Sequence, residues 1–127
     1  MDIINDDDVI AARQACRVLA AEIGFLYTDQ AMVAAVITEL ARNILDYAGR
    51  GEVLFHSIEA DGRRGMVVIA RDQGPGIANI KTAMQASYRV AGGLGLGLKG
   101  VQGLMDSLDI ISGPASGTTV TARKWLS

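Results

Sequence analysis

The sequence has little of what a disulfide, a zinc site or a membrane span requires. It contains one cysteine, Cys16, and one histidine, which excludes an internal disulfide and argues against zinc or Cys–His chemistry. Cys16 lies in a helical pattern and is interpreted as a small buried hydrophobe. No apolar run reaches the roughly 18 residues of a membrane helix, and the N-terminus is acidic where a signal peptide is basic. We therefore expect a cytoplasmic protein without membrane association.

Excess positive charge is also missing. The formal net charge is −2, and no basic run is longer than Arg63-Arg64, which argues against a nucleic-acid-binding face. The 127 residues, half of them hydrophobic, suit a single domain over residues 1–127 with a core of its own.

The first half of the chain changes from helical to strand periodicity. Apolar residues at three- and four-residue spacing predict a helix from the N-cap Asp8 to the stop at Gly24, and another from about residue 28 or 29 to Tyr47. The apolar face of the second helix is predicted to hold Met32, Val36, Leu40, Ile44 and Tyr47. Two short segments rich in β-branched residues, 52–59 and 65–71, then predict a β-hairpin with its turn at Asp61-Gly62.

The second half alternates loops with regular segments. Residues 72–76 and 92–97 are predicted loops, 79–87 a short polar helix, 98–108 a helix, and 109–112 and 118–124 two closing strands. Hairpin-linked strands without repeated βαβ units predict a two-layer α/β (α+β) sandwich, with an antiparallel or mixed sheet and helices on one face.

Glycine is abundant and clustered: eight of the fifteen glycines fall between Gly74 and Gly103. The run from Gly92 to Leu98 leads into a predicted helix, where free N–H groups and the helix dipole favour phosphate, and Lys99 adds positive charge. The G-x-G-x-x-G pattern that starts at Gly95 lacks the preceding strand and βαβ unit of a dinucleotide site. No Walker A loop is present either, because Gly100 follows Lys99.

Two further features carry two interpretations each, and a third carries one. Glu39 and Asn43 share a helix face and offer oxygens to Mg²⁺, or they are two solvated helix positions. Asp72 follows a strand and could accept a hydrogen bond from an exocyclic amine such as adenine N6, or belong to an ordinary turn. Gly117-Thr118-Thr119 taken alone indicates a turn.

In order and spacing, these features resemble the sequence boxes of the GHKL superfamily of ATPases and kinases. Residues Glu39 to Asn43 resemble the N box of this superfamily, and Asp72-x-Gly74-x-Gly76 resembles its G1 box. Gly93-x-Gly95-x-Gly97 resembles the G2 box, and Gly117-Thr118 resembles the last box. Within the superfamily, the chain looks most like the anti-sigma-factor serine/threonine kinases of the RsbT type. The stretches that carry this likeness are AARQACRVLAAEIGF, ELARNILDYAGRGEV, RDQGPGI, GGLGLGLKGV and KWL.

The resemblance implies the Bergerat ATP-binding fold, with an extra edge strand near Met1 to Asn5, and it implies ATP and Mg²⁺ as cofactors. Asn43, beside Glu39, would ligate Mg²⁺; Glu39 would orient or deprotonate the acceptor hydroxyl; Asp72 would hold adenine N6. Thr118 or Thr119 would support the adenine end. The implied adenine pocket consists of Gly74, Gly76 and Ile77, and the implied phosphate cradle of Gly93, Leu94, Gly95, Leu96, Gly97, Leu98 and Lys99.

The resemblance further implies a protein-serine/threonine kinase that phosphorylates another molecule, since neither a histidine-bearing helical domain nor a gyrase-like transducer domain accompanies the sequence. The implied substrate is a STAS-domain antagonist protein in a stress-signalling, partner-switching pathway. Once released from it, the kinase would activate a PP2C-type phosphatase. Two alternatives stay open: an anti-sigma factor that binds a sigma factor directly, and a non-catalytic module that binds ATP as a switch.

Overall fold

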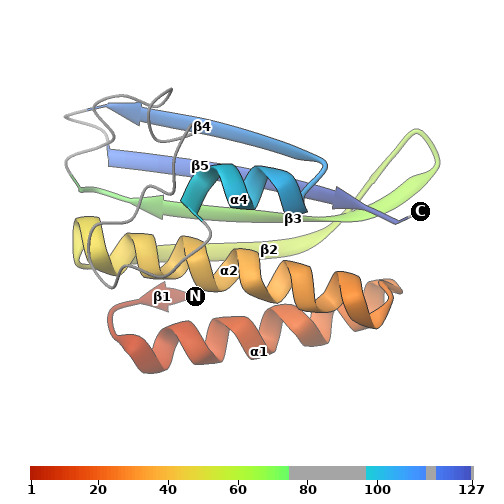
Figure 1. Cartoon of the computed structure of the whole chain (residues 1–127), viewed down its shortest axis with the longest axis horizontal. Coiled ribbons are helices and arrows are strands. Elements are labelled where there is room, and N and C mark those ends of the chain that lie inside the picture. The colour runs from red at the N-terminus through yellow and green to blue at the C-terminus, as the bar shows by residue number, and fades with distance from the viewer. Residues whose placement is uncertain (75–96, 114–116, 127) are drawn as a thin grey trace.

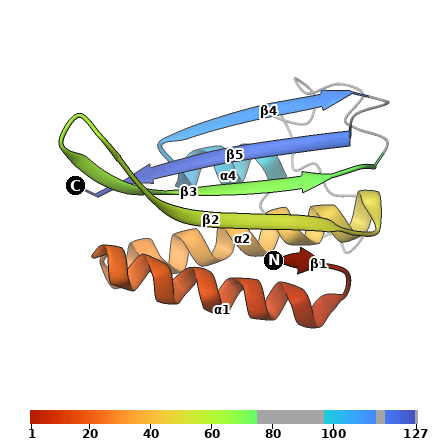
Figure 2. The same cartoon turned by 180° about the vertical axis from the view of Figure 1, so that it is seen from behind.

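The computed structural model describes residues 1–74, 97–113 and 117–126. Three helices of the described residues lie on one face of a five-stranded sheet, as Figures 1 and 2 show from opposite sides. The strand order is β1-β2-β3-β5-β4, and every pair in the described part is antiparallel. The predicted two-layer sandwich is confirmed. The elements are β1 Asp2–Ile3, α1 Asp6–Ile23, α2 Tyr27–Ala48, β2 Gly51–Ala60, β3 Arg63–Asp72, α4 Gly97–Leu104, β4 Ser107–Gly113 and β5 Gly117–Trp125.

The start of the chain confirms the edge strand and corrects the helix cap. Strand β1 pairs with β2, and Ile3 is fully buried. The predicted N-cap Asp8 is wrong, because α1 begins after Asn5. The Asn5 side chain accepts from the Asp8 N–H at 3.1 Å, and Asp8 Oδ2 accepts from the Asn5 N–H at 3.2 Å. Asp8 is thus the third residue of a capping box, within an acidic first turn that suits the helix dipole.

The ends of the two long helices follow the glycines. Gly24 ends α1 in the left-handed region, with φ of 113°, and its N–H donates to the carbonyls of Ala20 and Ala21. Gly49 ends α2 with φ of 83°. The predicted stop at Gly24 is confirmed, and α2 ends at Ala48, one residue beyond the predicted Tyr47.

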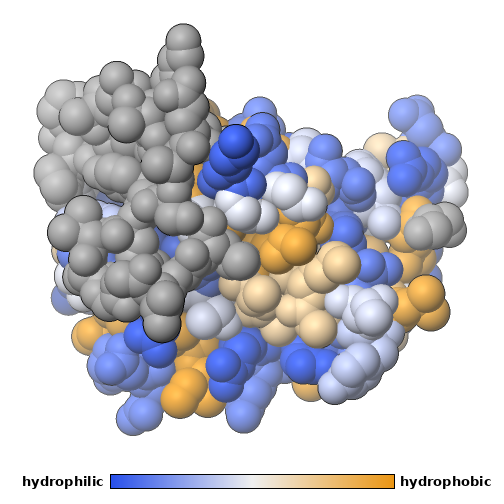
Figure 3. Space-filling model, viewed as in Figure 1, coloured by the Kyte–Doolittle hydropathy of each residue, from blue (hydrophilic) through white to orange (hydrophobic). Residues whose placement is uncertain are grey.

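Helix α2 buries a wider face than predicted, because it packs against both α1 and strands β2 and β3. Met32, assigned to the apolar face, is 37% exposed. Figure 3 views this helical side of the molecule, where hydrophobic residues form a central patch with hydrophilic residues above and below it. The buried apolar residues of α2 are Val33, Ala34, Val36, Ile37, Leu40, Ala41 and Ile44.

The hairpin of β2 and β3 has its turn at Asp61-Gly62, as predicted, and both residues have positive φ, 52° and 76°. This is the backbone of a type I′ turn. Strand β3 stays paired with its neighbours β2 and β5 up to Asp72, beyond its β-branched residues. Asp72, which was predicted in a loop, is therefore the last residue of β3.

Helix α4 is shorter than the predicted 98–108. It ends at Leu104, and β4 begins at Ser107. Asp106 stops the helix by bonding to β5: its N–H donates to the Arg123 carbonyl at 2.8 Å, and its Oδ2 accepts from the Trp125 N–H at 2.7 Å. The short polar helix predicted over 79–87 lies outside the described residues.

No helix in the described ranges is long and apolar enough to cross a membrane. The cytoplasmic location stays a prediction.

Cys16 is buried in the core, as predicted, and burial raises the pKa of its thiol from 9.0 to about 12. Because the thiolate is the reactive form, a thiol reagent at pH 8 should label the native protein far more slowly than the urea-unfolded protein. The thiol ionises first in the unfolded chain, so its contribution to stability is present below pH 9 and falls as pH rises from 9 towards 12. Ser57→Cys, at an exposed position, is the labelling control; equally fast native labelling of Cys16 would contradict its burial.

Candidate functional site

Glu39 and Asn43 lie one turn apart on α2. Glu39 is 4% exposed, and Glu39 and Thr118 are the buried polar or charged residues of the described part. Asn43 is half-buried, and both Glu39 and Asn43 have interaction partners. Burial of a carboxylate is costly. The alternative of a solvated helix position is therefore wrong for Glu39.

Asp72 ends β3, between Gly51 of β2 and Thr118 of β5. Its Oδ1 accepts from the Gly74 N–H at 2.9 Å, which fixes the carboxylate at the start of the following loop. Gly74 lies against the last turn of α2: a Cβ there would be 2.7 Å from the Ala48 Cβ. This contact brings the end of β3 to the C-terminal end of α2, the half of the helix that carries Asn43.

The sheet register separates the two candidate threonines. Thr118 lies opposite Asp72 and is 8% exposed. Thr119 lies opposite Arg71 and, since neighbouring strand residues alternate, faces the other side of the sheet. The structure therefore brings Thr118 to Asp72 and takes Thr119 away from it.

Ser112 of β4 is a polar neighbour that sequence reasoning missed. Its Oγ lies 2.9 Å from Thr118 Oγ1, and the two residues are register partners of β4 and β5. No sequence pattern marks Ser112, because only the register of the last hairpin brings it to Thr118.

Of the predicted phosphate cradle, the structure describes Gly97, Leu98 and Lys99. Gly97 begins α4 with φ of 67°, a conformation that favours glycine. Leu98 is 2% exposed and anchors α4 in the core, whereas Lys99 is exposed. The other predicted ligand residues lie outside the described residues: Gly76, Ile77, Gly93, Leu94, Gly95 and Leu96.

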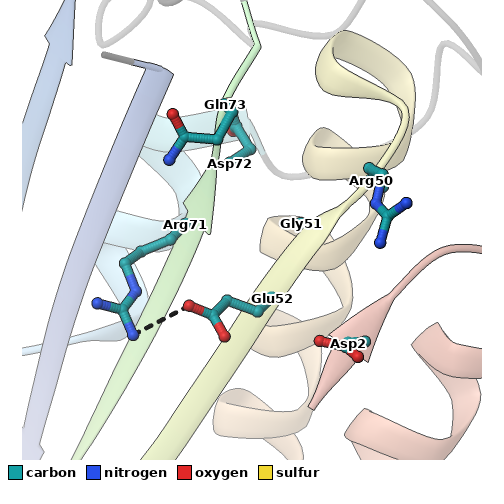
Figure 4. A pocket seen from close by; sticks show the side chains of 7 residues that line it. All are labelled: Asp2, Arg50, Gly51, Glu52, Arg71, Asp72 and Gln73. Atoms are coloured by element: carbon teal, nitrogen blue, oxygen red, sulfur yellow. Dashed lines mark ion pairs between the residues drawn. The ribbon is translucent and has the colours of Figure 1, made fainter.

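A separate cavity of about 400 Å³ touches this site through Asp72. Figure 4 shows Arg71 and Glu52 of its lining pointing toward one another, and their ion pair measures 3.0 Å. Asp2, Arg50, Gly51 and Gln73 complete the lining. Glu39, Asn43 and Thr118 are not among the lining residues, so this cavity is distinct from the cluster on α2, β3 and β5.

The family model described as histidine kinase-, DNA gyrase B- and HSP90-like ATPase matches residues 28–127. The chain belongs to this ATPase family. It is also 44% identical over 124 residues to the serine/threonine-protein kinase RsbT of Bacillus subtilis, covering 98% of this chain and 93% of that protein. Both matches confirm the resemblance inferred from the sequence boxes.

A solved structure with this fold contains the RsbU and RsbW domains of a Mycobacterium tuberculosis protein. It aligns over the whole chain with a TM-score of 0.63 at 22% identity, which shows a shared fold. The chain covers 33% of the chain in that structure.

As a member of the ATPase family, the chain uses ATP, and the described residues fit this nucleotide with a magnesium ion. Mg²⁺ takes one or two protein oxygens besides phosphates and waters, which a carboxylate and an amide on one helix face can supply. Asn43 and Glu39 are the candidate metal residues, and Asp72 with Thr118 the candidate base-binding residues.

The KWL segment at the end of β5 holds α4 in place. Lys124 Nζ donates to the carbonyl of Leu104, the last residue of α4, at 3.0 Å, and lies 4.0 Å from Asp29 Oδ1 of α2. A cation at a helix C-terminus is favourable. Lys124 therefore links α4, α2 and β5, the elements that carry the candidate site.

Replacing Gly74 by alanine should destabilise the protein by about 1–3 kcal/mol and weaken ATP binding, because the new Cβ meets Ala48 and must displace the loop that holds Asp72. Gly103→Ala is the matched control, since a Cβ at this helical glycine meets nothing within 4 Å. Thermal unfolding and calorimetric titration measure both effects. A Gly74→Ala protein as stable as the control would contradict the close contact.

Proposed function

We propose that this chain uses Mg·ATP to phosphorylate a serine or threonine of a STAS-domain antagonist protein and, once released from it, activates a PP2C-type phosphatase. The kinase class rests on the 44% identity to RsbT over nearly the whole chain: the protein is an RsbT-like serine/threonine-protein kinase. The STAS substrate, the phosphatase and the magnesium ion are inferred from the family resemblance.

The candidate residues suit phosphoryl transfer, which depends mainly on positioning and on neutralising charge. ATP with Mg²⁺ supplies a γ-phosphoryl group whose charge is partly neutralised. Asn43 holds the metal through its amide oxygen, and Glu39 accepts the proton of the acceptor hydroxyl. Because Glu39 is 4% exposed, its charge acts with little screening by solvent.

At the base end of the nucleotide, Asp72 accepts a hydrogen bond from adenine N6, and Thr118 lies beside it. This assignment is supported by the pairing of the two residues across β3 and β5. Of the two candidate threonines at the adenine end, the pairing favours Thr118, because Thr119 is the register partner of Arg71.

The proposal is tested by incubating the chain with γ-labelled ATP, Mg²⁺ and a purified STAS-domain protein. Label on the STAS protein, lost when its acceptor serine or threonine is replaced by alanine, is the expected result. ATP binding without transfer would indicate the non-catalytic switch module. Co-purification with a sigma factor instead of a phosphatase would indicate a direct anti-sigma factor.

A further inference from the structure

Three polar side chains follow one another across three neighbouring strands. Ser112 of β4 is the register partner of Thr118 in β5, and Thr118 is the register partner of Asp72 in β3. Register partners carry their side chains on the same face of a sheet, with Cβ atoms about 4.5–5.5 Å apart. The hydroxyls of Ser112 and Thr118 are 2.9 Å apart, within hydrogen-bonding distance.

We propose that Ser112 is a positioning residue that makes Thr118 a hydrogen-bond donor to the nucleotide base and thereby contributes to adenine selectivity. This inference rests on the proposed binding of adenine at Asp72. Ser112 itself does not contact the base; it acts by holding the hydroxyl of Thr118.

Two hydroxyls that share one hydrogen bond place a single proton between their oxygens. Either hydroxyl can donate in this geometry, and in the proposed arrangement Ser112 donates to Thr118 Oγ1, which leaves the Thr118 proton for a ligand. Asp72 can only accept when ionised, and its Oδ1 already accepts from the Gly74 N–H. The pair then presents an acceptor, Asp72, beside a donor, Thr118.

Adenine carries the complementary pattern. Its exocyclic N6 is a donor, and the neighbouring ring nitrogens N1 and N7 are acceptors, whereas guanine has an acceptor, O6, in place of the amine. The N6 amine thus suits Asp72, and one ring nitrogen suits Thr118, directly or through a water. Thr118 is 8% exposed, so a hydroxyl turned the wrong way has little solvent to compensate it.

The test compares nucleotide binding by the wild-type chain and Ser112→Ala. A neutral hydrogen bond corresponds to about a fivefold change in affinity, so Ser112→Ala should raise the Kd and KM for ATP about fivefold and leave kcat unchanged. Ser112→Thr keeps a hydroxyl and should restore affinity. Ser107→Ala is the control, since Ser107 lies on the opposite face of β4 at its other end and pairs with Arg123.

Base analogues separate positioning from general damage. If Thr118 contacts N1, the increase in Kd caused by Ser112→Ala should fall below about twofold with 1-deaza-ATP; if it contacts N7, the same should hold with 7-deaza-ATP. The increase should persist with purine riboside triphosphate, which keeps both nitrogens and lacks the amine. The proposal would be overturned if Ser112→Ala raised the Kd equally for all analogues or left the Kd for ATP unchanged. It would also be overturned if Ser112→Thr did not restore the affinity for ATP. Failure of the wild-type chain to bind ATP would instead refute the proposed function, and the binding arms do not depend on transfer activity.

Discussion

Replacing Glu39 by glutamine should lower the rate of γ-phosphate transfer to a protein acceptor by about 10²- to 10⁴-fold, the usual contribution of a general base. Glutamine keeps the volume of the side chain and one accepting oxygen but cannot take up the proton of the acceptor hydroxyl. ATP affinity should change by less than about twofold if Glu39 acts mainly on the acceptor. Single-turnover transfer and calorimetric titration with Mg·ATP separate these two quantities.

The control for this substitution is Glu22→Gln on the exposed side of α1, which should leave transfer unchanged. Thermal unfolding checks that Glu39→Gln is folded, since the side chain is 4% exposed and has interaction partners that the change can weaken. A folded Glu39→Gln protein that transfers phosphate at the wild-type rate would show that Glu39 is not the base.

The long helices and the hairpin were predictable because each depends on local chemistry. Apolar spacing marks α1 and α2, Gly24 ends a helix through its left-handed backbone, and Asp61-Gly62 suits a tight turn. The error at the start of α1 arose because two local choices compete. Asn5 and Asp8 are both good N-caps, and the reciprocal bonds of the capping box make Asn5 the cap and Asp8 its partner.

The candidate site was predictable only in part, because its remaining geometry comes from strand register. The spacing of Glu39 and Asn43 on one helix is a local property and could be inferred from the sequence. Which of Thr118 and Thr119 faces Asp72 depends on how β5 pairs with β3, and a shift of one residue would exchange them. Ser112 enters the cluster only through the pairing of β4 with β5.

Replacing Asn43 by alanine should weaken Mg·ATP binding by roughly 10- to 100-fold, the range seen when residues that support a metal are lost. The amide oxygen is the proposed metal ligand, and Asn43 lies one turn of α2 beyond the buried Glu39, so a metal there would lie beside the base. The effect must depend on the metal: with ATP in excess EDTA, the variant and the wild type should agree within about twofold. Gln102→Ala, at an exposed position of α4, is the control. Equal Mg·ATP affinity of Asn43→Ala and the wild type would remove Asn43 from the metal site and leave Glu39 as the remaining candidate ligand on α2.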